Sequence, residues 1–273
     1  MAAAGDYAGA STMLEGALQG LRGQGTETES RACGNLGSLY AALGRRFEAI
    51  LLWRRGQAIA EALGLGLLAA KHRANLCGGY AALELWSILR SAWQESAARI
   101  EELPAEERSG ARDLYLWPRV YLALHDGDVE AAHELSQAFH EAYASWRDPT
   151  SRGLAAVMRA DIMAARGLAE RALDVLAAAE VIQDLPLLDR IYVAYQTVHH
   201  LEQGGRSVEA RERASAVLDW VEAVHTESGP GDLSISMTAD LGRLLAVDPE
   251  RTEDAKRAFD LAGTGVLARI AEL

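Results

Sequence analysis

The chain has 273 residues, 49% of them apolar, with 39 acidic side chains against 27 basic ones and a formal net charge of −12. This composition is typical of a folded globular protein and excludes a disordered or collagen-like chain. The acidic balance argues against direct nucleic-acid binding, because such proteins gain affinity by placing Lys and Arg on phosphates. The apolar residues are mainly Ala and Leu, which favours helices over strands.

The chain carries no predicted targeting or membrane segment. Its N-terminus lacks the basic and apolar regions of a secretory signal. The most apolar stretch, 58–70, is shorter than the roughly 20 residues of a membrane helix. Cys33 and Cys77 lie in helical patterns without metal or redox spacing. We therefore expect a cytoplasmic protein that requires no cofactor and does not bind a membrane.

A six-residue element recurs at the start of several expected helices. It begins with a glycine and ends with a small residue, which we call the closing residue. It occurs at 5–10, 44–49, 127–132, 167–172 and 205–210. A sixth, degenerate copy ends at Leu89. The closing residues are then Ala10, Ala49, Leu89, Ala132, Ala172 and Ala210, and successive ones are 39, 40, 43, 40 and 38 positions apart. Residues 35–43 and 75–83 also match at six of nine positions. A fixed period of this length predicts a repeat architecture.

Each repeat is interpreted as two antiparallel helices. The glycine at the bend is expected to adopt a positive φ, and the small closing residue to pack back on the first helix. Large apolar residues four positions further on are expected to fill the space between pairs: Leu14, Trp53, Trp93 and Leu176. One pair cannot bury that face alone, so the pairs must stack.

Proline and glycine positions predict where helices begin and end. Pro104, Pro149, Pro186 and Pro249 fall at expected helix starts, often with Asp as N-cap. Pro118 lies inside an apolar helical run and predicts either a kink or a helix that begins at Trp117. The Gly/Pro-rich segment 226–232 is expected to separate the final helix pair, 235–273.

The pattern Asn-Leu-Gly-x-x-Tyr at 35–40, followed by Gly-x-x-x-Glu-Ala at 44–49, resembles the tetratricopeptide repeat. The spacing of about 40 residues is similar to the long-helix variety found in sensor regions of large bacterial transcription activators and in peptide-responsive regulators. The resemblance implies an all-α fold, a right-handed α-solenoid of about six antiparallel helix pairs. It would form one domain over 1–273.

The first recognisable element, 5–18, corresponds to the second helix of a repeat whose first helix is absent, so 1–24 is an incomplete repeat. A solenoid normally ends in a polar cap. We therefore expect either that this chain is a segment of a longer protein or that another subunit covers its N-terminal face. The second alternative implies a homo-oligomer.

Two pairs of polar residues are the sharpest candidates for a binding groove. Arg31 and Asn35 are four apart, as are Lys71 and Asn75, and the two pairs are 40 apart, so all four are expected on one surface. The resemblance implies that the asparagines hold a peptide backbone and that the basic residues pair with a carboxylate. Alternatively, the asparagines bond neighbouring backbone and the basic residues are merely solvated.

Later repeats carry a mixture of aromatic and polar residues at the aligned inner positions: Trp117, Tyr121, Asp161, Tyr192, Tyr195 and His199. Such a mixture is typical of a groove for a peptide or small molecule. The alternative is that the rings pack between helices with their polar tips outward. The place of Asn35 is taken by Pro118, Met158 and Gln196, so no carboxylate clamp is expected along the full groove.

No metal or catalytic motif is found in the sequence. His133 and His140 are seven apart and His199 and His200 are adjacent, and neither spacing matches His-Glu-x-x-His. There is no nucleophile elbow and no phosphate-binding glycine loop. A helical-toroid hydrolase would need two inner carboxylates, and Asp161 is the only one placed there.

The sequence therefore predicts a scaffold without enzymatic activity that binds a protein, peptide or small effector in its concave groove. The resemblance implies that it serves as the sensor or interaction region of a larger bacterial regulator. Two alternatives stay open. One is a structural module that associates with itself, and the other is a helical-toroid enzyme.

Overall fold

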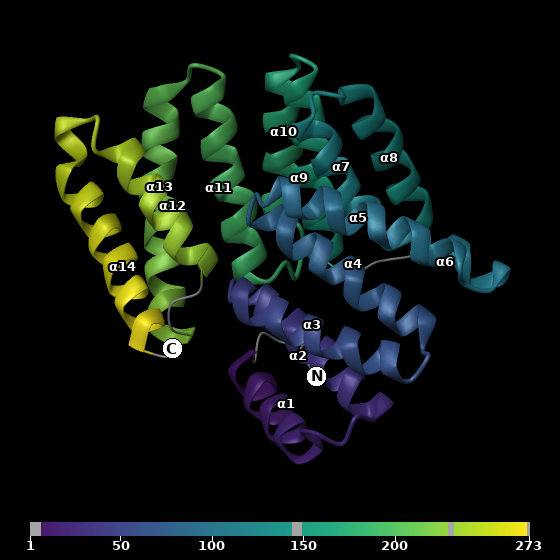
Figure 1. Cartoon of the computed structure of the whole chain (residues 1–273). Helices are drawn as coiled ribbons and strands as arrows, with labels where there is room; N and C mark the ends of the chain where they lie inside the picture. Colours follow the sequence, from purple (N-terminus) through teal and green to yellow (C-terminus); the bar gives the residue numbers. More distant parts are fainter. Residues whose placement is uncertain (1–6, 144–148, 229–231, 272–273) are drawn as a thin grey trace. The chain divides into compact units, whose positions relative to one another are not determined.

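The computed structural model describes residues 7–143, 149–228 and 232–271 (Figure 1). Within these residues the chain forms fourteen α-helices and one 3₁₀ helix, and no strand. The predicted all-α class is therefore confirmed. The chain divides into two compact units, Met1–Ser145 and Trp146–Leu273, each with its own cores.

The first unit holds eight of the described helices, and neighbours along the chain pack as pairs. The first helices of adjacent repeats also touch, α2 with α4 and α4 with α7. The bounds are α1 (Tyr7–Leu21), α2 (Glu27–Ala42), α3 (Arg46–Ala62), α4 (Gly66–Ala82), α5 (Trp86–Glu101), α6 (Ala105–Asp113), α7 (Leu116–His125) and α8 (Val129–Ala142).

The second unit repeats the same arrangement with six described α-helices, packed in succession from α9 to α14 (Figure 1). The first helices α9 and α11 are again in contact. The bounds are α9 (Pro149–Ala165), α10 (Ala169–Glu180), α11 (Leu187–Gln203), α12 (Ser207–Ser228), α13 (Asp232–Leu245), the 3₁₀ helix η2 (Pro249–Arg251) and α14 (Thr252–Ala271).

The bends inside the helix pairs adopt the conformation that the repeat predicts. Gly44 has φ +75°, and Gly127, Gly167 and Gly205 each have φ +76°. In the degenerate repeat the same bend is made by Glu84 with φ +55°. A residue with a Cβ is strained there, because the left-handed region crowds Cβ against the following carbonyl.

We expect Glu84→Gly to raise the stability of the protein by about 1 kcal/mol, since the strain is relieved and the exposed side chain is not needed for packing. The measurement is the midpoint of thermal unfolding followed by circular dichroism. Gly167→Ala is the matched reverse variant and should lower the midpoint. If Glu84→Gly left the midpoint unchanged while Gly167→Ala lowered it, Glu84 would not be strained.

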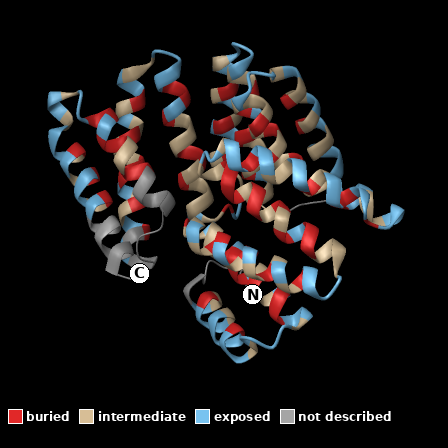
Figure 2. Cartoon of the chain, viewed as in Figure 1, coloured by how far each residue is buried: buried red, intermediate tan, exposed pale blue. Residues whose placement is uncertain are grey.

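The small closing residues lie inside the helix pairs. Ala49, Ala132, Ala172 and Ala210 are buried, and Leu89 is buried at the corresponding place in α5. Figure 2 shows buried residues in red along the helices of the chain. Of the large residues four positions further on, Trp53 and Leu176 are buried, and Leu14 and Trp93 are half-buried. Burial of the closing residue is thus confirmed in five of the six repeats, and Ala10 is half-buried. A buried place at a helix contact explains why most repeats carry a small side chain there.

Several predicted helix starts are also confirmed. Pro104 and Pro186 directly precede α6 and α11, α9 begins at Pro149, and Asp248 accepts a hydrogen bond from the Glu250 N–H at the start of η2. Asp184 is not an N-cap; it lies in the preceding turn with φ +60°. The interruption predicted at 226–232 is shorter in the structure, because α12 continues to Ser228 and α13 begins at Asp232. Residues 229–231 lie outside the described residues.

Pro118 does not kink a continuous helix. The chain breaks between α6 and α7, and α7 begins at Leu116, one residue before the predicted start. The break is filled by Tyr115, whose buried hydroxyl donates to the Ala70 carbonyl at 3.0 Å. Pro118 therefore sits in the first turn of α7, where a missing N–H costs no helical hydrogen bond.

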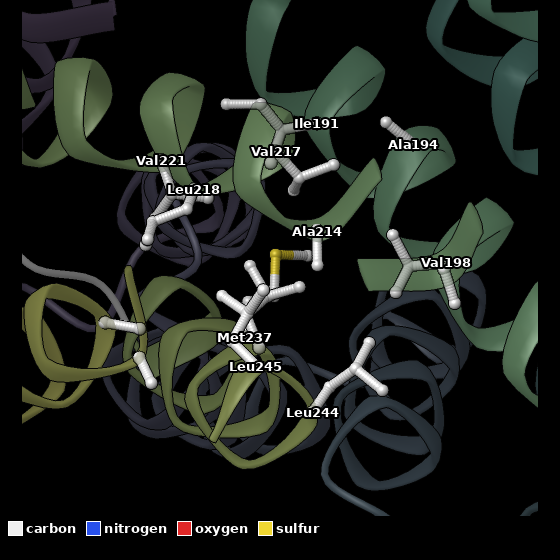
Figure 3. Packing of buried hydrophobic residues seen from close by; sticks show 14 of the residues in the cluster. Ile191, Ala194, Val198, Ala214, Val217, Leu218, Val221, Met237, Leu244 and Leu245 are labelled. Atoms are coloured by element: carbon white, nitrogen blue, oxygen red, sulfur yellow. The ribbon is translucent and has the colours of Figure 1, made fainter. Parts of the chain in front are cut away.

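Each unit has an apolar core made at the helix contacts. In the second unit, Leu218 and Val221 of α12 meet Met237 and Leu245 of α13 (Figure 3). Residues from α11 and α14 join the same cluster, so one core joins two consecutive pairs. The stacking of neighbouring pairs within this unit follows from that shared burial.

Candidate functional site

The first unit brings six of the predicted groove residues onto three touching first helices. Arg31 and Asn35 lie on α2, Lys71 and Asn75 on α4, and Trp117 and Tyr121 on α7. We call these six residues the first-helix strip. Asn35 and Lys71 are exposed and Asn75 is half-buried, whereas Cys33, Leu36 and Cys77 on the other sides of α2 and α4 are buried.

The two asparagines of the strip keep their hydrogen-bonding capacity. Neither carboxamide makes a hydrogen bond in the part of the chain that the structure describes. The interpretation in which Asn35 and Asn75 stabilise the repeat by bonding neighbouring backbone is therefore not realised here. Each amide presents a donor and an acceptor that no neighbour uses.

The basic residues of the strip differ from each other. The Arg31 guanidinium pairs with Glu27, one turn earlier on α2, at 2.6 Å, and both side chains are exposed. An exposed pair of this kind contributes little stability and exchanges readily with water. The ammonium group of Lys71 has no ion-pair partner among the described residues.

Trp117 and Tyr121 form the apolar end of the strip. Their rings are tilted toward each other with centroids 5.1 Å apart. Trp117 also lies over Gly78 of α4, where a Cβ would come within 3.3 Å of the indole ring. The indole N–H of Trp117 is buried without an acceptor, which makes it an unsatisfied donor within the strip.

The predicted residues of the second unit are mostly engaged within the fold. Asp161 Oδ1 lies 2.9 Å from Nε2 of His200, which is buried, whereas His199 is exposed and stacks on Tyr195. The Tyr195 hydroxyl donates to Asp240 of α13 at 2.7 Å. Tyr192 packs against two of the apolar clusters. In this unit Tyr192 and Tyr195 therefore match the alternative in which the rings pack between helices, rather than a binding groove.

A buried polar network that the sequence did not indicate joins α2, α3 and α4. The Ser30 hydroxyl donates to the Gly56 carbonyl at 2.8 Å and lies 3.0 Å from Nε2 of His72. Because the single hydroxyl proton is used on the carbonyl, Ser30 must accept from His72, which places the imidazole proton on Nε2. Burial lowers the pKa of His72 to about 4, so the ring is neutral near pH 7.

The turn before α2 is fixed by a buried carboxylate. Thr26 caps the helix by accepting from the Glu29 N–H, and Glu29 accepts from the backbone N–H groups of Gly23 and Gly25. Burial raises the pKa of Glu29, but these bonds and the Arg55 guanidinium together hold it below its ordinary value. The Thr-x-x-Glu spacing of a capping box could have revealed this arrangement in the sequence.

Two other kinds of feature are absent from the described residues. No group of three or more His, Cys, Asp or Glu side chains among them is arranged to hold a metal ion. In the same residues, no helix combines the length and apolar character needed to cross a bilayer.

Comparison with known proteins adds no family assignment. Neither a protein-family model nor a curated protein matches this chain. The likeness to tetratricopeptide repeats thus rests on the residues of the repeat and on the paired helices.

Proposed function

We propose that the protein binds an extended peptide segment along the first-helix strip and has no enzymatic activity of its own. The observation that carries this proposal is the pair of unbonded carboxamides, Asn35 and Asn75, at corresponding places on two touching helices. An extended backbone offers alternating donors and acceptors, which two such amides can bind in succession.

The residues around the amides fit the same kind of ligand. The Lys71 ammonium can pair with an acidic group of the peptide, and the Trp117 and Tyr121 rings can receive an apolar side chain. Asn is a poor residue for a helix interior, and neither amide makes an internal bond that compensates. Binding of a ligand by the amides would explain why Asn occurs at this place in both repeats.

The wider setting follows from the resemblance. We propose that the helix pairs stack as a right-handed α-solenoid of the tetratricopeptide type. We also propose that the chain serves in the cytoplasm as the sensor or interaction region of a larger bacterial regulator. Occupancy of the strip would then change the curvature of the solenoid, which is the signal passed to the rest of the regulator.

The test uses a library of short random peptides selected on the immobilised chain. We expect peptides from this selection to lose affinity about tenfold or more for the double variant Asn35→Ala, Asn75→Ala, because each amide contributes about 1 kcal/mol through its hydrogen bonds. The same variant should melt at an equal or higher temperature, because Ala is the better helix former. Affinity is measured by fluorescence anisotropy with labelled peptide.

Gln94→Ala is the matched control, since Gln94 is an exposed amide on the second helix α5. Peptides should bind this variant as tightly as the unmodified chain. The proposal fails if the selected peptides bind the double variant unchanged, or if the double variant loses stability while its affinity is retained.

Self-association through α1 stays a prediction. Met13 on α1 is 62% exposed, and Ala17 is exposed at the place where α3 carries the buried Gly56. The side of α1 that exposes these residues therefore carries apolar and small side chains, as helices do where they pack together. The hypothesis of a homo-oligomer requires such a surface.

A further inference from the structure

Arg119 of α7 is a half-buried cation without a counter-charge. Its guanidinium lies over the ring of Trp93 on α5, 4.6 Å from the ring centroid. No carboxylate, carbonyl or hydroxyl accepts a hydrogen bond from this side chain anywhere in the described chain. The contact with Trp93 is thus the one specific interaction found for the charged group in those residues.

Every other half-buried arginine of the described chain has at least one acidic or carbonyl partner, although Nε of Arg73, Arg190 and Arg257 is itself unbonded. Those with an acidic partner are Arg45, Arg55, Arg73, Arg206, Arg211, Arg213, Arg251 and Arg257. Those that donate to a backbone carbonyl are Arg46, Arg108 and Arg190. In a chain of net charge −12, acidic partners are plentiful, so the missing partner of Arg119 is a local property of this site.

The unpaired charge has a cost that a ligand would remove. Burial lowers the pKa of Arg119, with no neighbouring charge or hydrogen bond opposing the shift. Stacking on an aromatic ring compensates part of that cost, but it leaves the N–H groups at the edge of the guanidinium without acceptors. These N–H groups have no acceptor among the described residues, and an anion in the plane of the guanidinium would accept hydrogen bonds from them.

The aromatic support under the cation is itself fixed. Trp93 packs against Tyr115 with ring centroids 5.3 Å apart, and the Tyr115 hydroxyl is bonded to the Ala70 carbonyl. The guanidinium above this ring has the planar donor arrangement that matches a carboxylate with two parallel hydrogen bonds.

We propose that Arg119, supported by Trp93, binds a single carboxylate group. One uncompensated cation matches one negative charge, whereas phosphate carries between one and two negative charges at neutral pH and favours sites with several cations. The site is separate from the first-helix strip. Arg119 is two residues from Trp117 and from Tyr121, which places it about 200° away around the helix axis.

The test is an NMR titration of the full chain, observing the Arg119 side-chain Nε–H resonance. Three probes are added at matched ionic strength: N-acetylglutamic acid α-amide for a side-chain carboxylate, N-acetyl-Ala-Gly for a C-terminal carboxylate, and inorganic phosphate. We expect a saturable shift with one or both carboxylates in the millimolar range, and the tighter of the two identifies the source. A shift on raising the protein concentration alone would assign the carboxylate to a second copy of the chain.

The proposal is overturned if chloride produces the same shift as the carboxylates, if phosphate binds more tightly than either, or if no addition produces a saturable change. A second measurement uses Arg119→Met, which keeps the side-chain length without the charge. Carboxylate should raise the melting temperature of the unmodified chain but not of this variant. Arg159→Met, which alters an exposed arginine of α9, and the Asn35→Ala, Asn75→Ala variant should both keep the response.

Discussion

Gly56→Ala is expected to destabilise the protein by about 3 kcal/mol and to lower its melting temperature by on the order of 10 °C. A Cβ on residue 56 would lie 2.4 Å from Cε1 of His72, in a ring that is already packed against Gly34. The ring cannot move without losing its bond to Ser30. Helix propensity alone predicts the opposite sign, because Ala is favoured over Gly in a helix interior by about 1 kcal/mol.

Gly16→Ala is the matched control, since a Cβ there would meet no atom within 4 Å and Gly16 also lies inside a helix. It should leave the melting temperature unchanged or raise it. Adding His72→Ala to Gly56→Ala should recover part of the loss, because the clash is removed. A Gly56→Ala variant as stable as the unmodified chain would show that the contact of His72 with α3 is loose.

The second large effect is a loss of stability in acid that depends on His72. Its pKa is about 4 in the folded chain against an ordinary value of 6.5. Between these values the unfolded chain binds a proton that the folded chain does not, so the free energy of unfolding falls as the pH is lowered. The total loss from this group is about 3 kcal/mol, and it is complete near pH 4. Urea unfolding at a series of pH values measures it.

The comparison that isolates His72 is the variant His72→Gln, which retains a donor for Ser30 but cannot titrate. Its stability should depend less steeply on pH between about 6.5 and 4 than that of the unmodified chain, while other titrating groups contribute equally to both. His140→Gln, an exposed histidine of α8, should behave as the unmodified chain does. Equal slopes for all three proteins would mean that His72 is protonated without cost.

The repeat was predictable because its determinants are local. A glycine at a bend and a small residue five positions later fix the conformation of a pair whatever surrounds it, and Gly44 with Ala49 or Gly167 with Ala172 shows both in place. Glu84 shows the limit of such signals. At position 84 the chain makes the same bend with a glutamate in place of the glycine that favours it. Tertiary packing between neighbouring pairs therefore overrides the local preference.

The candidate site was predictable only in part. The spacing of Arg31, Asn35, Lys71 and Asn75 predicted a common surface, and the contact of α2 with α4 brings these helices together. The spacing could not indicate that Asp161 would meet His200 rather than His199, because these neighbours lie about 100° apart around the helix and the repeat pattern does not fix which of them faces α9. Ser30 and His72 are 42 positions apart, and no periodic pattern marks a polar pair buried between helices. The Arg119 site was not predicted, because what distinguishes this arginine is the lack of a hydrogen-bond or ion-pair partner, and a sequence does not show which arginines find one.

The uniform bends also have a mechanical consequence. At Gly44, Gly127, Gly167 and Gly205 the turn is short and φ is the same to within a degree, so we expect no soft joint at the tips of these four helix pairs. A chain pulled from its ends should therefore yield at the contacts between pairs and release one pair at a time. Once a released pair also unfolds, its 38 to 43 residues would span roughly 125 to 155 Å of extended chain.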